Sequence, residues 1–345
     1  MTWYSYNLLS IFILDILSIV CILMIIAYIT VVERKYMAYM QRRVGPNSVG
    51  IFGTLQAFSD AIKLVIKEVI YPIQSNSFLF WFSPIISLFI SIILWCIIPL
   101  TEYFVIYNNN INIIVSICIN SISVFGIVFA GWSANNKYTF ISTIRSTAQV
   151  ISYELVFGII LILIMFIGNS FNFINIIYNQ IYVYNIFILI PVYILFWISV
   201  LAESGRTPFD LIEAESELVA GYMTEHSSVI FVFFFLSEYS SIVFFSTIIS
   251  ILFYGGFIFN TFIINTIYFT IQPIVLGIKS IINMIIFVWV RATLPRIKFE
   301  QLMQFCWIDL LPVCIGFIFV IFSVVILFIL YKYIIYIYIY SICIL

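Results

Sequence analysis

Residues 8–32, LLSIFILDILSIVCILMIIAYITVV, form one apolar run that holds a single charged residue, Asp15. A helix of about 20 apolar residues crosses the hydrocarbon core of a bilayer, so this run predicts a membrane-spanning helix. The run is too long for the apolar core of a secretory signal, and no small-residue cleavage site follows it. We therefore expect it to remain in the protein as the first span.

The whole chain shares this character. Of its 345 residues, 64% are hydrophobic and 8% are charged, which excludes a water-soluble domain. The apolar runs lack the alternation of a β-barrel, so they predict helices that satisfy their own backbone in lipid. We expect an all-α integral membrane protein with eight transmembrane helices and one polytopic domain over residues 1–345. The spans are predicted at residues 8–32, 79–100, 111–132, 148–168, 181–202, 228–253, 271–290 and 313–340. Pro191 should kink the fifth span.

The cations lie almost entirely on one side of these spans. Loops after odd-numbered spans hold 12 of the 14 Lys and Arg residues, whereas loops after even-numbered spans hold none. These 12 are Arg34, Lys35, Arg42, Arg43, Lys63, Lys67, Lys137, Arg145, Arg206, Arg291, Arg296 and Lys298. Because positive loops stay on the inner side of membranes, both termini should face outward. A partner protein is expected to dock on the charged inner face.

Residues 54–68, TLQAFSDAIKLVIKE, predict an amphipathic helix in the first inner loop. Its apolar side is formed by Leu55, Phe58, Ile62, Val65 and Ile66, and its polar side by Gln56, Asp60, Lys63 and Lys67. The segment is too short and too polar to span, so it should lie in the membrane interface. There it would contact lipid, a partner protein or both, and it would be able to wall an opening toward the lipid.

Four ionisable residues fall within predicted spans: Asp15, Glu154, Glu238 and Lys279. Each costs about 2.5–3.5 kcal/mol at a helix centre, so such a residue normally faces the bundle interior and has a partner. Asp15 lies near the outer end of its span, within reach of water. The other three form either a buried proton relay or a structural ion pair, for instance Glu238 with Lys279. Carboxylates outnumber cations at depth, which favours the relay.

Residues 203–225, ESGRTPFDLIEAESELVAGYMTE, form an acidic inner-face loop with six of the chain's 15 acidic residues and one fixed cation, Arg206. The sequence at Thr207 to Asp210 is typical of a helix start, and a continued helix would place Glu213 and Glu217 on one face. Carboxylates gathered in a poorly hydrated cleft cannot all ionise, so some of their pKa values should rise toward neutrality. The loop therefore predicts a proton-handling site, with an ordinary solvated loop as the alternative.

Other kinds of site are not indicated. The six cysteines show no C-x-x-C spacing, and one histidine cannot build a known zinc or haem site. The chain has no P-loop and no GxGxxG, which argues against nucleotide binding. The single histidine, His226, follows Glu225 at the start of a span. It either titrates near neutral pH or is a hydrogen-bonded structural group.

Seven strings together resemble one family. They are ERK at 33–35 with QRRVGPN at 41–47, LQAFSDAIKLVIKE at 55–68, GWSANNKY at 131–138 with RSTAQVISYE at 145–154, RTPFDLIEAESELVAGY at 206–222, and FVWVRATLPRIKFEQLM at 287–303. In order and spacing, these resemble subunit 1 of the proton-pumping NADH:quinone oxidoreductase, respiratory complex I, over about residues 8–312. The resemblance implies a subunit at the heel of that complex, where it forms the ubiquinone tunnel together with partner subunits.

The resemblance also implies roles for individual residues. The quinone tunnel would be bordered by Glu33, Arg34, Asp60, Arg145, Arg206, Phe209 and Asp210. Proton coupling would involve Glu154, Glu213, Glu215, Glu217, Glu225, Glu238 and Lys279. No residue of this chain alone would be catalytic, and the chain would hold no metal or flavin, because the quinone headgroup ligands and the iron–sulfur clusters belong to partner subunits.

Partners and location follow from the same resemblance. The expected partners are the quinone-module subunits of the peripheral arm on the matrix face, the small and antiporter-like subunits of the membrane arm, and lipids, but no nucleic acid. The expected location is the mitochondrial inner membrane, with both termini toward the intermembrane space. A composition rich in Ile, Phe, Tyr and Asn suits an AT-rich organelle genome.

Three alternatives remain open from the sequence. The first is the heel subunit of a related membrane-bound hydrogenase, which looks similar around the acidic loop and need not use quinone. The second is a stand-alone channel or transporter, which would show internal repeats that this sequence lacks. The third is a structural anchor without a catalytic role, against which the buried charges argue.

Overall fold

The computed structural model of the chain describes residues 8–211, 220–258 and 265–344. All regular structure within these residues is helical, which confirms the all-α class. The α-helices are α1 (Leu8–Met40), α2 (Gln56–Ile66), α3 (Ser77–Trp95), α4 (Asn112–Ala134), α5 (Lys137–Gly168), α6 (Phe173–Asn179), α7 (Asn185–Ile188), α8 (Ile190–Glu203), α10 (Ser228–Phe253), α11 (Asn265–Thr293), α12 (Phe299–Gln304) and α13 (Leu311–Ile344). Short 3₁₀ or π turns cover Ile51–Gly53, Gly221–Met223 and Phe305–Leu310.

Seven helical stretches of the described part are long and apolar enough to cross a membrane, which confirms a multi-pass membrane protein. The fifth predicted span differs, because residues 185–203 form two helices, α7 and the 14-residue α8, that meet at Leu189. Pro191 lies in the first turn of α8, where its missing N–H leaves no helical hydrogen bond unmade. The kink predicted at this proline is therefore a full break between two helices.

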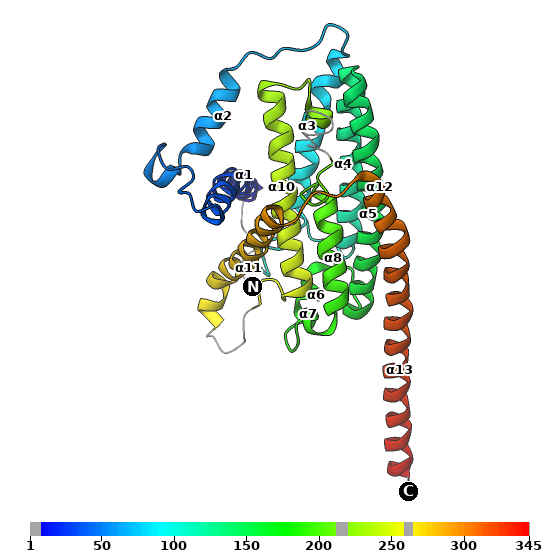
Figure 1. Cartoon of the computed structure of the whole chain (residues 1–345). Helices are drawn as coiled ribbons and strands as arrows, with labels where there is room; N and C mark the ends of the chain where they lie inside the picture. The colour runs from blue at the N-terminus through cyan, green and yellow to red at the C-terminus, as the bar shows by residue number, and fades with distance from the viewer. Residues whose placement is uncertain (1–7, 212–219, 259–264, 345) are drawn as a thin grey trace.

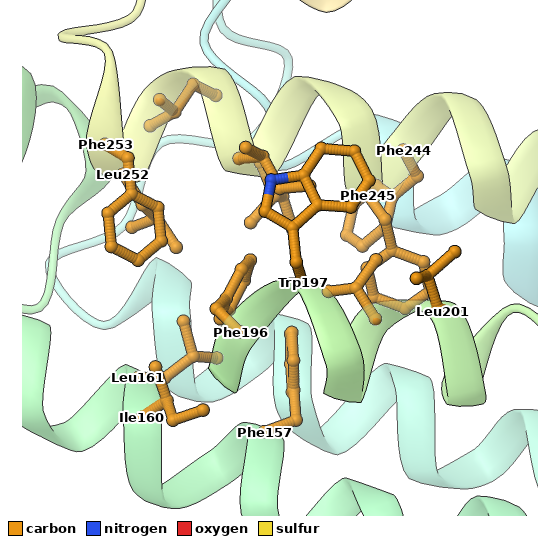
Figure 2. Packing of buried hydrophobic residues seen from close by; sticks show 14 of the residues in the cluster. Phe157, Ile160, Leu161, Phe196, Trp197, Leu201, Phe244, Phe245, Leu252 and Phe253 are labelled. Carbon is orange, nitrogen blue, oxygen red and sulfur yellow. The ribbon is translucent and has the colours of Figure 1, made fainter. Parts of the chain in front are cut away.

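The helices α5 and α10 are the most buried of the candidate spans. Figure 2 shows aromatic and aliphatic side chains of α5, α8 and α10 packed against one another. The Phe157 ring stacks on Phe196 with centroids 5.3 Å apart and meets the edge of Phe245 at 5.7 Å. Within lipid, such contacts associate helices through dispersion and close fit rather than through removal of water.

Helices α4 and α5 approach each other closely at Gly131. A Cβ atom at this position would collide with the side chain of Thr143 on α5, so only glycine fits. Small residues at helix crossings are the usual means by which membrane helices bring their backbones together. The α5 helix begins 11 residues before its predicted span, at Lys137, because the side chain of Asn136 caps it by accepting from the Tyr138 N–H.

Two helices pack against the bundle only in part. The amphipathic helix predicted over residues 54–68 is present as α2, and none of its residues is fully buried. Figure 1 shows α2 beside α1 and separated from α3 by an extended segment. At the other end of the chain, the 34 residues of α13 measure about 50 Å at 1.5 Å per residue, against a hydrocarbon core of about 30 Å. Its C-terminal half extends beyond the other helices (Figure 1).

Candidate functional site

Three spans and one turn bring four polar side chains together, which we call the Glu33 cluster: Glu33, Arg206, Tyr239 and Arg291. Glu33 of α1 is only 4% exposed, and its carboxylate forms ion pairs with Arg291 of α11 and with Arg206, whose Nη1 lies 3.7 Å from Oε1. The hydroxyl of Tyr239, on α10, donates to Glu33 Oε2 over 2.6 Å. The Arg206 guanidinium also lies over the Tyr239 ring, 4.5 Å from its centroid.

The Glu33 cluster satisfies the requirements of a buried charge. A carboxylate removed from water is strongly destabilising unless opposite charges and hydrogen-bond donors surround it. Here two guanidiniums and one hydroxyl face a single carboxylate, so the cluster keeps one excess positive charge. Such a group of donors favours ligands with oxygen acceptors.

Arg206 and Asp210 lie on the turn 204–211, which follows α8 without regular structure. Gly205 adopts a φ of +62°, in the left-handed region where a residue without Cβ is not strained. Asp210 is buried and pairs with Arg296, with 2.7 Å between Oδ2 and Nη2. The turn is thereby fastened to the segment that follows α11.

A largely apolar cavity of about 400 Å³ lies between α1, α2 and α10. Phe231 and Phe235 of α10 form part of its wall. At its polar side, Arg34 of α1 pairs with Asp60 of α2 over 2.6 Å, and Gln56 donates to the same carboxylate over 2.9 Å. The volume is within the range of pockets that bind small organic molecules.

The space beside the Glu33 cluster is much smaller. It measures about 20 Å³ and is closed by Ile29, Met284 and Phe287. A cavity of this size holds about one water molecule and no ring-sized ligand. A ligand in the larger cavity would therefore reach the cluster only if side chains between the two spaces move.

Another cavity, of about 90 Å³, lies between α3, α4, α5, α8 and α10, and its lining is more apolar than polar. It holds the carboxylates of Glu203 and Glu238. Asn120 donates to Glu203 over 2.5 Å, and the Tyr222 hydroxyl donates to Glu238 over 3.3 Å. The cavity is also lined by six serines, which are Ser87, Ser91, Ser123, Ser204, Ser237 and Ser241. Two carboxylates in a hydroxyl-lined space are an arrangement that can hold and pass protons.

Three other residues expected at the site lie near these features. Glu154 of α5 is half-buried. Glu225 accepts a hydrogen bond of 2.7 Å from Asn136 at the start of α5. Arg145 lies over the ring of Phe299, 5.4 Å from its centroid.

Phe209 does not face the 400 Å³ cavity. It is 4% exposed and packs on the ring of Tyr153, with centroids 5.6 Å apart. It belongs to the hydrophobic core of the bundle, so it holds the turn 204–211 in place.

Lys279 binds backbone carbonyls rather than a carboxylate. Its ammonium group donates to the carbonyls of Tyr254, Gly256 and Ile258 over 2.7, 2.8 and 2.8 Å. An ammonium has three hydrogens, so all are used, and the suggested ion pair with Glu238 is not formed. Lys279 instead satisfies carbonyls of the segment after α10, where a helix end leaves such groups without partners. Its expected place in a proton path stays a prediction.

His226 is buried between Phe80 and Phe234, with ring centroids 4.1 and 5.2 Å away. Burial lowers the pKa of this imidazole from 6.5 to about 4, so the ring is neutral at physiological pH. Of the two alternatives for His226, this environment favours the structural group, packed between two aromatic rings.

The acidic residues Glu213, Glu215 and Glu217 lie outside the described residues. Five polar residues that make the contacts described above were not in the predicted site: Asn120, Glu203, Tyr239, Arg291 and Arg296. Signals for three of them were present, since Glu203 begins the acidic loop and both arginines lie in the string at 287–303. Tyr239 and Asn120 gave none, because uncharged polar residues are common in helices. No group of three metal-ligating side chains occurs in the described part of the chain.

Comparison with known proteins agrees with the motifs. The family model described as NADH dehydrogenase matches residues 14–322. The chain is 47% identical to NADH-ubiquinone oxidoreductase chain 1 of Mycosarcoma maydis over 94% of this chain and 97% of the relative. It is 43% identical to the protein of that name from Yarrowia lipolytica, over 91% and 96%, and 41% identical to that from Chondrus crispus, over 93% and 98%.

These matches confirm the resemblance to subunit 1 of respiratory complex I and make this chain one subunit of an oxidoreductase complex. With its apolar helices and its fungal and algal relatives, it is a multi-pass protein of the inner membrane. The chain belongs to the NADH dehydrogenase family, and the three relatives described above all carry the name NADH-ubiquinone oxidoreductase chain 1.

Proposed function

We propose that this chain forms the membrane end of the tunnel through which ubiquinone reaches its reduction site. We further propose that it begins the charge path that couples quinone reduction to proton translocation. The observation that carries the first part is the position of the 400 Å³ cavity next to the Glu33 cluster. Phe235 lines that cavity, and its ring contacts Tyr239 of the cluster, with centroids 5.0 Å apart.

The chemistry of ubiquinone suits these two spaces. Its isoprenoid tail is apolar and would contact the walls that α1, α2 and α10 provide. Its ring carries carbonyl oxygens, which accept hydrogen bonds from guanidinium and hydroxyl groups such as those of Arg206 and Tyr239. Arg34 and Asp60, at the polar side of the cavity, would border the path of the headgroup, and the electrons would come from partner subunits.

The charge path rests on the serine-lined cavity. Its 90 Å³ has room for several waters, and its hydroxyls supply the partners that buried waters need. Glu203 and Glu238 are at this cavity, Glu154 lies half-buried on α5, and Glu225 lies three residues before α10. We propose that Glu213, Glu215 and Glu217 connect these carboxylates to the quinone tunnel, since their segment joins Asp210 to Glu225 in the sequence.

The charged inner face would then contact the quinone-module subunits on the matrix side, and the bundle would contact the small and antiporter-like membrane-arm subunits. Both termini would face the intermembrane space, as the placement of the cations predicts. An organelle-encoded gene stays a prediction. The hydrogenase and transporter alternatives have no support among the relatives reported above.

The tunnel is tested by the Arg206→Ala substitution, with the Lys137→Ala substitution of an exposed inner-face cation as the control. Membranes with the assembled complex are assayed for NADH:ubiquinone reductase with a short-chain ubiquinone and for NADH:ferricyanide reductase, which bypasses the quinone. We expect Arg206→Ala to raise the quinone KM by about tenfold, since loss of one charged hydrogen bond is worth about 1.4 kcal/mol. Equal quinone kinetics in both variants would refute the proposed tunnel.

A further inference from the structure

We propose that Gln149, a buried residue of α5, is a positioning residue that holds Arg206 in place at the quinone tunnel. The inference rests on the proposed tunnel and adds a residue that makes no contact with the cavity. It concerns how the turn 204–211, which has no regular structure, keeps a buried guanidinium in one position.

The amide of Gln149 connects the two ends of this turn. The residue is 0% exposed, and its Nε2 donates to the carbonyls of Ala202 and Phe209 over 2.8 Å each. Ala202 belongs to the last turn of α8, and Phe209 lies near the end of the turn 204–211. Arg206 lies between them in the sequence, so the two hydrogens of one amide close the base of the loop that carries Arg206.

Both carbonyls already have a backbone donor. The Ala202 carbonyl accepts from the Gly205 N–H over 3.3 Å, and the Phe209 carbonyl accepts from the Leu211 N–H over 3.0 Å. Loss of Gln149 would therefore leave neither oxygen without a partner. What Gln149 adds is the connection between the two oxygens, which no local hydrogen bond of the turn supplies.

The oxygen of the same amide lowers stability, whereas its two hydrogens raise it. Gln149 Oε1 is buried without a hydrogen-bond partner in the described part of the chain. A reversed amide would place this oxygen against two carbonyl oxygens, so the orientation is fixed by repulsion. An unmade buried hydrogen bond costs about as much as one or two made bonds contribute, so the net effect of Gln149 on stability is small. We therefore assign Gln149 to fixing the shape of the turn rather than to stabilising the fold.

The far side of the turn is held separately. The Thr207 hydroxyl donates to the Arg291 carbonyl over 3.3 Å, and the Ile297 N–H donates to the Pro208 carbonyl over 3.0 Å. Gln149 supplies the matching attachment to α5. Without it, the end of α8 and Phe209 are joined only through the backbone of Arg206, whose N–H donates to the Leu201 carbonyl over 3.2 Å and whose carbonyl accepts from the Phe209 N–H over 2.8 Å. Packing of Phe209 on Tyr153 keeps the turn folded, but the loop that carries Arg206 loses its closure at the base, and Arg206 shifts relative to Glu33. The Arg206 to Glu33 distance of 3.7 Å is close to the limit of an ion pair, so a small shift breaks this contact.

The test is the Gln149→Met substitution in the assembled complex, because methionine has a similar shape and no hydrogen to donate. The matched control is Gln180→Met. Gln180 is also a buried glutamine whose Nε2 donates to two carbonyls, Ile176 and Ile251, but it lies at the end of α6 and away from the turn 204–211. Its Oε1 also accepts from the N–H groups of Gly255 and Asn185, which would lose this partner.

The two variants should show opposite results. For Gln149→Met we expect the KM for a short-chain ubiquinone to rise by about fivefold, with NADH:ferricyanide activity and the temperature of heat inactivation unchanged. For Gln180→Met we expect a lower inactivation temperature and an unchanged quinone KM. The proposal is overturned if Gln149→Met lowers the inactivation temperature without changing KM, or if it changes neither quantity.

The Arg206→Ala variant separates failure of this inference from failure of the proposed tunnel. If Arg206→Ala raises the quinone KM and Gln149→Met does not, only the role of Gln149 is refuted. If Arg206→Ala leaves the quinone KM unchanged, the tunnel itself is refuted.

Discussion

The Glu33→Gln substitution removes the only carboxylate of the Glu33 cluster and leaves one buried and one half-buried guanidinium facing each other. In the native chain, Glu33 pairs with Arg206 and Arg291 and accepts from the Tyr239 hydroxyl. A glutamine of the same shape keeps the packing and one acceptor oxygen but not the charge. We expect it to disturb the quinone kinetics because the repelled arginines no longer hold their positions.

The size of the effect follows from the burial of each partner. Removal of one partner from a buried ion pair costs about 3–5 kcal/mol. The side chains of Glu33 and Arg206 are 6% and 8% exposed, whereas that of Arg291 is 29% exposed and is partly screened by solvent. We therefore expect about 2–3 kcal/mol, which corresponds to a fall in kcat/KM for ubiquinone of roughly 30- to 160-fold.

A double-mutant cycle measures whether this effect belongs to the pair. The Arg291→Met substitution alone should also lower kcat/KM, and the Glu33→Gln/Arg291→Met variant should be less impaired than the sum of the two predicts, by about 1–3 kcal/mol. The pair of Arg34 and Asp60 is the control, because its side chains are 49% and 38% exposed and should show a coupling energy below about 1 kcal/mol. Additive effects of Glu33→Gln and Arg291→Met would refute the reasoning.

Three further predictions concern the rest of the bundle. Lys279→Met and Asn185→Leu should each lower the temperature of heat inactivation. The first leaves carbonyls after α10 without a side-chain donor, and the second does so at the end of α10. Unchanged temperatures would contradict the described contacts. Because the pKa of His226 is about 4 when folded and 6.5 when exposed, its neutral form stabilises the fold above pH 6.5 and this stability is lost as the pH falls toward 4, by up to about 3 kcal/mol. His226→Phe should remove this part of the acid sensitivity in heat-inactivation curves at several pH values, and curves that coincide with those of the native protein would rule it out. Glu203→Gln should slow proton translocation and ubiquinone reduction without changing the quinone KM, as followed in sealed vesicles, whereas native rates would exclude Glu203 from the charge path.

The spans could be predicted because lipid imposes a simple requirement on sequence. A long apolar run has to be a helix when no water is present to satisfy the backbone, and the predicted and observed spans agree except at the fifth. There, the break at Leu189 depends on how α6 and α7 pack at the end of α10, where Gln180 and Asn185 donate to its last carbonyls. Hydropathy carries no information about such contacts.

Residues of the proposed site could be named from the sequence, but their partners could not. Glu33 and Arg206 were expected at the tunnel from the family strings, but Glu33 meets Arg291 and Tyr239 across 258 and 206 residues of sequence. Pairings of this kind are set by helix packing. Lys279 shows the same limit, because a lysine and a glutamate at similar depth suggested a pair, whereas the structure gives Lys279 three backbone carbonyls.

The most direct test of the proposed tunnel is photoaffinity labelling of the intact complex with an azido-ubiquinone, followed by mapping of the labelled peptides of this chain. The account predicts labels on α1, α2 and on α10 around Phe231 and Phe235, and their loss when excess ubiquinone competes. Labels confined to α13 or to the outer loops, or labels that excess ubiquinone does not remove, would contradict it.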